Sequence, residues 1–77
     1  MMKEKVLNVL KGINPAIKEG VNLLDEGIID SFEVVNIVME LEETFEVEID
    51  AEEVIAENFA TVDAIIALME RMVSQEG

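Results

Sequence analysis

Ser31 is the residue of this 77-residue chain whose type and setting best suit covalent chemistry. It follows Asp30, which has the side chain of a helix N-cap, and Glu33 stands where the partner of a capping box is found. We therefore expect a helix to begin at Ser31. A serine in the first turn of a helix lies outside the core, close to unpaired backbone N–H groups and to the positive end of the helix dipole. Such a position would accept a phosphate ester.

The composition excludes most other side-chain chemistry. The chain contains no His, Cys, Tyr or Trp, so a catalytic triad, a thiolate nucleophile and an imidazole base are excluded. Neighbouring carboxylates such as those of Glu42 and Glu43 point about 100° apart on a helix, and they do not converge on one substrate atom. The spacing of an EF-hand loop is also absent, so Mg²⁺ or Ca²⁺ would bind only weakly over the acidic surface. We expect no catalytic residues and no dedicated metal site.

The charge of the chain indicates the kind of partner it binds. The formal net charge is −13, from 18 Asp and Glu residues against 5 Lys and Arg, and no basic residue occurs between Lys18 and Arg71. This argues against nucleic acid and anionic membranes and favours proteins with basic patches. Hydrophobic residues make up 51% of the chain, which is too many for a disordered acidic tail. No signal peptide or membrane-spanning stretch is recognisable, so we expect a cytoplasmic protein.

The apolar pattern predicts an all-α domain that covers residues 1–77. Helical spacing indicates helices over residues 3–12 and 31–45, a short third helix with Asp50 as its N-cap, and a last helix capped by Thr61. Residues 14–29 lack a sustained period and should form a long ordered loop, whereas residues 46–49 should form an extended link. Asn58-Phe59-Ala60 should interrupt the helical structure between the short third helix and the last helix. The expected fold is a small four-helix bundle, with three longer helices and one short one, in a monomer.

The second predicted helix carries two apolar stripes. Its core-facing residues are expected to be Val34, Ile37, Val38, Leu41 and Phe45. A second stripe is formed by Phe32, Val35 and Met39, with Asn36, Glu42 and Glu43 beside it. Either the helix is buried nearly all round, or the second stripe is a docking surface, since an apolar patch rimmed by carboxylates suits protein partners. On the docking interpretation, Glu42, Glu43 and Met39 bind partners and do not hold the fold together.

The stretch Gly27-Ile28-Ile29-Asp30-Ser31-Phe32, together with residues 38–49, resembles the acyl carrier proteins, and the resemblance extends from about residue 24 to about residue 72. It implies that Ser31 carries 4′-phosphopantetheine, derived from coenzyme A, with Asp30 and Phe32 beside it. It also implies that partner enzymes bind at the positions of Val35, Met39, Glu42 and Glu43. Asn36 departs from the pattern, because fatty-acid carriers usually have an acid there. Ile28-Ile29 is closer to the D-alanyl and other specialised carriers.

The function implied by this resemblance is that of a non-catalytic thioester carrier. Its expected partners are a phosphopantetheinyl transferase, an acyl- or aminoacyl-loading ligase, and synthase or transferase enzymes with basic patches. The cargo remains open between an acyl chain for fatty-acid or polyketide-like synthesis and an amino acid such as D-alanine, loaded by an adenylating ligase. A different hypothesis, an unmodified acidic helical adaptor, uses the same fold and the same patch, with Ser31 only as part of a helix start.

Overall fold

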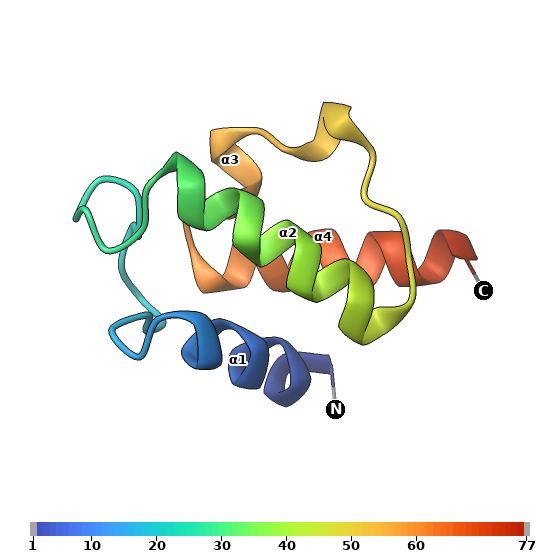
Figure 1. The fold of residues 1–77 in the computed structure, drawn as a ribbon, viewed down its shortest axis with the longest axis horizontal. Helices are drawn as coiled ribbons and strands as arrows, with labels where there is room; N and C mark the ends of the chain where they lie inside the picture. Colours follow the sequence, from blue (N-terminus) through green and yellow to red (C-terminus); the bar gives the residue numbers. More distant parts are fainter. Residues whose placement is uncertain (1, 77) are drawn as a thin grey trace.

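Helices account for most of residues 2–76, which this computed structural model describes, with side chains through residue 74. Within that range the elements are α1 (Met2–Ile13), α2 (Ser31–Phe45), the 3₁₀ turn η1 (Ala51–Glu53), α3 (Ala56–Phe59) and α4 (Val62–Glu76) (Figure 1). The described residues contain no strand. This confirms the expected bundle of three longer helices and one short helix, with a long loop between α1 and α2.

The core is built around α4. Helix α1 packs against both α2 and α4, and α3 packs against α4. Residues with no exposed surface come from every helix: Val6, Leu10, Ile37, Leu41, Phe59, Val62, Ile65, Leu68 and Met69. The predicted core stripe of α2 is confirmed by Ile37 and Leu41, while Val34, Val38 and Phe45 are half-buried against the core. Helical spacing in the sequence predicts a core stripe of Val62, Ile65, Ile66, Met69 and Val73 on α4. In the structure Leu68 and Met72 are buried as well, while Ile66 and Val73 are only half-buried, so the buried face of α4 is turned toward Leu68 and Met72.

The loop between α1 and α2 is held by the backbone of Leu23. Its N–H donates to the carbonyl of Ala60 at 2.6 Å, and its own carbonyl accepts hydrogen bonds from Ile28 at 2.9 Å and from Ile29 at 3.2 Å. The Leu23 side chain is fully buried. Gly27 has φ 71°, a value that glycine adopts without the steric cost of a side chain, and this turns the chain back toward Leu23. The prediction of an ordered, packed loop is confirmed.

The segment after α2 differs from the expectation in two respects. Asp50 makes no side-chain cap hydrogen bond, and the Glu53 N–H bonds to its backbone carbonyl instead, so only the single turn η1 forms. Asn58 and Phe59 do not interrupt a helix but belong to α3. The physical reason is that Phe59 is a fully buried core residue, which fixes a separate helical turn at this position.

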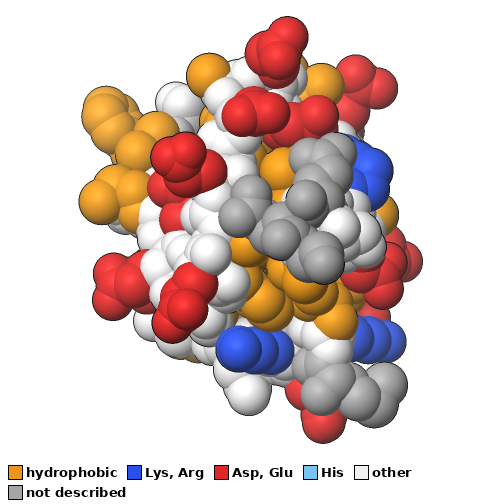
Figure 2. All heavy atoms as spheres, turned by 90° about the vertical axis from the view of Figure 1, so that its right-hand side faces the viewer, with side chains coloured by type: hydrophobic (Ala, Val, Ile, Leu, Met, Phe, Trp, Pro, Cys, Tyr) orange, Lys and Arg blue, Asp and Glu red, His pale blue; other side chains and the backbone are white. Residues whose placement is uncertain are grey.

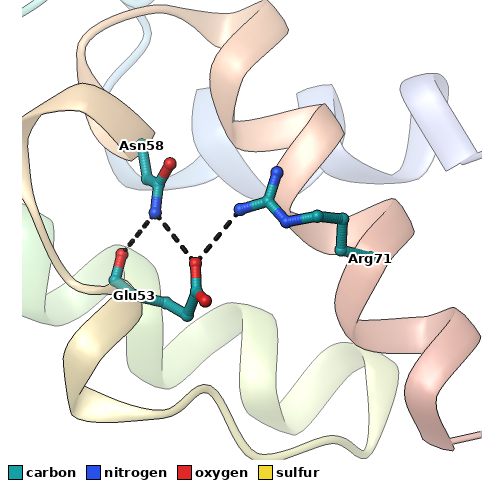
Figure 3. Close-up of polar contacts among 3 residues, drawn as sticks. All are labelled: Glu53, Asn58 and Arg71. Atoms are coloured by element: carbon teal, nitrogen blue, oxygen red, sulfur yellow. Dashed lines mark hydrogen bonds and ion pairs between the residues drawn. The ribbon is translucent and has the colours of Figure 1, made fainter.

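A polar network ties η1 and α3 to α4 (Figure 3). The Asn58 Nδ2 donates to the Glu53 carbonyl at 2.8 Å and to the Glu53 Oε1 at 3.1 Å. The same Oε1 accepts a hydrogen bond from the Arg71 Nη2 at 3.1 Å. One carboxylate of η1 is therefore bound by α3 and α4 together, which fixes the irregular segment between α2 and α3.

Candidate functional site

Ser31 is the first residue of α2, and its side chain is exposed. The preceding Asp30 has an extended backbone, and its Oδ1 accepts a hydrogen bond from the Glu33 N–H at 2.9 Å. The Asp30 cap is therefore formed as predicted, and it satisfies one of the N–H groups that a helix start leaves without an acceptor. The Glu33 carboxylate differs from the capping-box expectation, because it accepts a hydrogen bond from the Asn14 side chain at 3.0 Å.

A pocket of about 330 Å³ lies beside Ser31, between the start of α2 and the segment from η1 to α3. Its walls include Leu24, Val34, Val35, Val54, Ile55 and Phe59, and Ser31 is the polar residue in its lining. The volume is at the lower end of the range for small-molecule sites. Sequence analysis did not find this pocket, because three segments that are far apart in the chain form it.

The second apolar stripe of α2 is exposed. Phe32 is 82% exposed, Met39 60% and Val35 53%, and we call these three residues the α2 apolar patch. The interpretation that α2 is buried nearly all round is therefore wrong. Ile55, which is 45% exposed, adds a further apolar side chain from the segment before α3, and it lines the same pocket as Val35.

The polar residues expected beside this patch have unequal surroundings. Asn36 and Glu43 are exposed, whereas Glu42 is half-buried and its Oε2 accepts a hydrogen bond from the Ile49 N–H at 2.8 Å. Glu42 therefore does hold part of the fold, contrary to the expectation that it serves only partners. Figure 2 shows one end of the molecule, where acidic side chains are scattered around the periphery and hydrophobic ones protrude at the left edge and are visible near the centre.

The site contains no arrangement for bond-making by the chain itself. The one ionisable group next to Ser31 in the sequence is the Asp30 carboxylate, and this carboxylate already accepts a hydrogen bond from the Glu33 N–H. Within residues 2–74, no group of three or more Asp or Glu side chains is placed to hold a metal ion. None of the helices in the described range has the length and apolarity needed to cross a membrane. The arrangement offers an exposed hydroxyl at a helix start, beside an apolar pocket and an apolar patch.

Comparison with known proteins gives a consistent result. A family model described as "Phosphopantetheine attachment site" matches residues 3–69. The D-alanyl carrier protein of Bacillus mycoides (strain KBAB4) is 35% identical over 74 residues, which cover 91% of this chain and 94% of that protein. The D-alanyl carrier proteins of Bacillus cereus (strain B4264) and Bacillus anthracis (strain CDC 684 / NRRL 3495) are 34% identical over the same shares. No solved structure matches significantly. These names give no specific support to fatty-acid synthesis as the pathway.

Proposed function

The chain belongs to the family of phosphopantetheine-binding carrier proteins, and from this premise we propose that Ser31 is its attachment residue. Carriers of this family are non-catalytic, and their covalently attached 4′-phosphopantetheine supplies a terminal thiol that holds a cargo as a thioester. The observation that carries the proposal is the exposed position of Ser31 at the first residue of α2, directly after a formed N-cap. The other serine of the chain, Ser74, lies near the end of α4.

The surroundings of Ser31 suit a phosphate ester. The first N–H groups of a helix have no intrahelical acceptor, and together with the helix dipole they favour an anion at this end. In the modification, the Ser31 oxygen bonds to the β-phosphorus of coenzyme A, the bond from that phosphorus to the nucleotide part breaks, and adenosine 3′,5′-bisphosphate leaves. The serine proton passes to a base of the transferase, because the chain has no His and the Asp30 carboxylate already accepts a hydrogen bond from the Glu33 N–H.

Intact-mass measurement tests the attachment. After incubation with coenzyme A and a broad-specificity transferase, the wild-type chain should gain one 4′-phosphopantetheinyl group. Ser31→Ala should gain none, whereas Ser74→Ala should be modified as the wild type is. Modification of the Ser31→Ala variant, or a wild type that a competent transferase never modifies, would show that the proposal is wrong. The second of these results would favour the unmodified adaptor.

A carrier interacts with a phosphopantetheinyl transferase and with the enzymes that load and unload it. We propose that these enzymes bind the face of α2 formed by Val35, Asn36, Met39 and Glu43, with Phe32 next to Ser31. The exposure of these side chains and the negative charge around them support this, since apolar contact gives affinity and charge complementarity gives orientation. Glu42 lies at the edge of the face, where a partner would have to compete with Ile49 for its carboxylate.

We propose D-alanine, loaded by an adenylating ligase, as the cargo. The support is that the relatives, which match 91% of the chain at 34–35% identity, are D-alanyl carrier proteins. Because the prosthetic group comes from coenzyme A, we also propose that the chain is modified and loaded in the cytoplasm.

One observation favours a second cargo class. A D-alanyl thioester carries an ammonium group and gains nothing from apolar walls, whereas an apolar acyl chain would be stabilised in the pocket beside Ser31. The mass of the thioester isolated from the native cell distinguishes the two. A D-alanyl mass supports the first proposal, and a longer acyl mass supports the second.

A further inference from the structure

Asn14, at the end of α1, touches the chain on both sides of Ser31. Its Nδ2 donates to the Ile28 carbonyl at 2.8 Å and to the Glu33 Oε1 at 3.0 Å. Its Oδ1 accepts a hydrogen bond from the Ala16 N–H at 2.9 Å, and its own N–H donates to the Leu10 carbonyl at 2.9 Å. One side-chain nitrogen that is fixed to α1 therefore joins the residues before and after the attachment site.

Asn14 orients the first turn of α2 together with two core contacts that flank the turn, the buried Ile29 before it and the half-buried Val34 after it. The side chains of Asp30, Ser31 and Phe32 are exposed, and Phe32 is 82% exposed, so none of the three is anchored in the core. The cap formed by Asp30 lies within the turn itself and does not connect the turn to another element. Asn14 makes that connection, and its bond to the Glu33 carboxylate belongs to the stronger, charge-assisted class of hydrogen bonds.

We propose that Asn14 is a positioning residue, which holds the first turn of α2 in the orientation in which a transferase receives the Ser31 hydroxyl. This inference rests on the proposed function, because it takes Ser31 as the attachment residue. The α2 apolar patch extends along the helix to Met39, whereas Glu33 is the one residue of α2 that the Asn14 side chain hydrogen-bonds within the part of the chain that the structure describes. Loss of the Asn14 side chain should therefore lower the turnover of modification and leave binding of the transferase nearly unchanged.

Asn58 provides a matched control. Its Nδ2 also joins a carbonyl at 2.8 Å and a carboxylate oxygen at 3.1 Å, but both belong to Glu53 of η1 (Figure 3). Removing either asparagine side chain deletes these two kinds of hydrogen bond, and removing that of Asn14 also deletes the acceptor of the Ala16 N–H, which Asn14→Asp retains. Only Asn14 connects to the first turn of α2. A comparison of the two variants therefore separates positioning of Ser31 from a general loosening of the domain.

The experiment measures the modification kinetics of Asn14→Ala and Asn58→Ala with saturating coenzyme A, below the unfolding temperature of every variant. For Asn14→Ala we expect kcat to fall about tenfold while KM changes less than about twofold, since small misplacements of a reacting group cost turnover. Asn58→Ala should keep both values within about twofold of wild type. Hydrogen exchange should quicken, in Asn14→Ala only, at the Glu33 and Val34 amides, which are hydrogen-bonded to Asp30 in the first turn. This readout needs no transferase.

A second pair of variants covers the case in which Asn14→Ala does not fold. Asn14→Asp keeps the oxygen that Ala16 bonds but places a carboxylate against Glu33, so it should also lower kcat. Adding Glu33→Gln supplies an amide donor from the other side, and it should recover kcat at least partly. If kcat fell only because the domain was destabilised, adding Glu33→Gln to Asn14→Asp would not recover it.

The outcomes separate the two proposals. Modification of the wild type at Ser31 is measured first, and its absence contradicts the proposed function. If the wild type is modified, wild-type turnover in both Asn14 variants overturns the inference. Equal slowing of Asn14→Ala and Asn58→Ala overturns it as well, as does unchanged hydrogen exchange at the Glu33 and Val34 amides.

Discussion

The Glu42 carboxylate accepts a hydrogen bond from the Ile49 backbone N–H at 2.8 Å, seven residues further along the chain. The Glu42 carbonyl also accepts hydrogen bonds from the Glu46 and Val47 N–H groups. Glu42 thus binds the extended link that follows α2 through both its backbone and its side chain. The adjacent Glu43 is exposed, so two neighbouring glutamates of one helix have different roles.

Glu42→Ala should lower the free energy of unfolding by about 1–2 kcal/mol, because the Ile49 N–H loses its acceptor in a segment that buries the side chains of Val47 and Ile49. Glu43→Ala should change it by no more than about 0.5 kcal/mol, as surface substitutions usually do. Glu42→Gln retains an acceptor oxygen and should stay close to wild type. Urea denaturation measures all three, and equal stabilities for the two alanine variants would contradict the assignment.

Glu46→Gly should stabilise the domain. Glu46 ends α2 with φ 56° and ψ 47°, a left-handed conformation that is costly for a residue with a side chain and natural for glycine. The expected gain in unfolding free energy is about 0.5–1 kcal/mol. Glu48→Gly is the control, since it removes the same charge from an extended position and should bring a smaller gain than Glu46→Gly. A Glu46→Gly variant no more stable than Glu48→Gly would argue against this prediction.

The features that were predictable from the sequence are those set by neighbouring residues. Asp30 and Thr61 cap α2 and α4 through hydrogen bonds that span three residues, and helical periodicity alone places Ile37 and Leu41 in the core. The exposure of the α2 apolar patch was also predictable, because the helix carries more apolar residues than one face can bury. Ser31 could be singled out because its setting is local.

The features that were missed depend on residues far apart in the chain. The contacts of Asn14 span 14 and 19 residues, and nothing in the sequence near either end indicates them. Glu42 looked like a surface acid, since its partner is a backbone group of an irregular segment. Asp50 has the same local pattern as Asp30 but forms no side-chain cap, because the segment is fixed instead by the network around Glu53.

The melting temperature should rise with salt. Within the described residues the ion pairs are Lys3 with Glu19 and Arg71 with Glu53, so most of the 18 acids have no cationic partner within contact distance. Salt screens the resulting repulsion. A triple variant with Gln at Glu48, Glu52 and Glu57, all exposed, should melt higher at low salt and depend less on salt. Identical salt dependence in the variant and the wild type would speak against charge repulsion as the cause.

Lys3 should remain protonated to a higher pH than an ordinary lysine. The hydrogen bond to Glu19, at 2.9 Å, and the attraction of its charge raise the pKa of Lys3 above 10.5. The pair therefore stabilises the folded state fully below the unfolded pKa, and this contribution is lost as the pH rises through the folded pKa. Titration followed by NMR at the Lys3 side chain should show the raised value, and Glu19→Gln should lower it. A Lys3 titration that is unaffected by Glu19→Gln would rule out the pair as its cause.

Glu43→Lys should weaken partner binding without weakening the fold. The substitution places a positive charge next to the α2 apolar patch, so it should slow the encounter with a basic enzyme surface and reduce the salt dependence of that encounter. The free energy of unfolding should change by about 0.5 kcal/mol or less, since Glu43 is exposed. Leu41→Ala removes a fully buried side chain of the same helix and should cost roughly 2–5 kcal/mol.

Chemical denaturation and the rate of transferase modification compare the two variants directly. Below its unfolding transition, Leu41→Ala should be modified at close to the wild-type rate, because its docking residues are unchanged, whereas Glu43→Lys should be modified more slowly at low salt. Raising the salt should narrow that difference, because screening weakens both the attraction in the wild type and the repulsion in the variant. If Glu43→Lys unfolds the domain, or is modified as fast as the wild type at low salt, then partners bind a different face of the molecule.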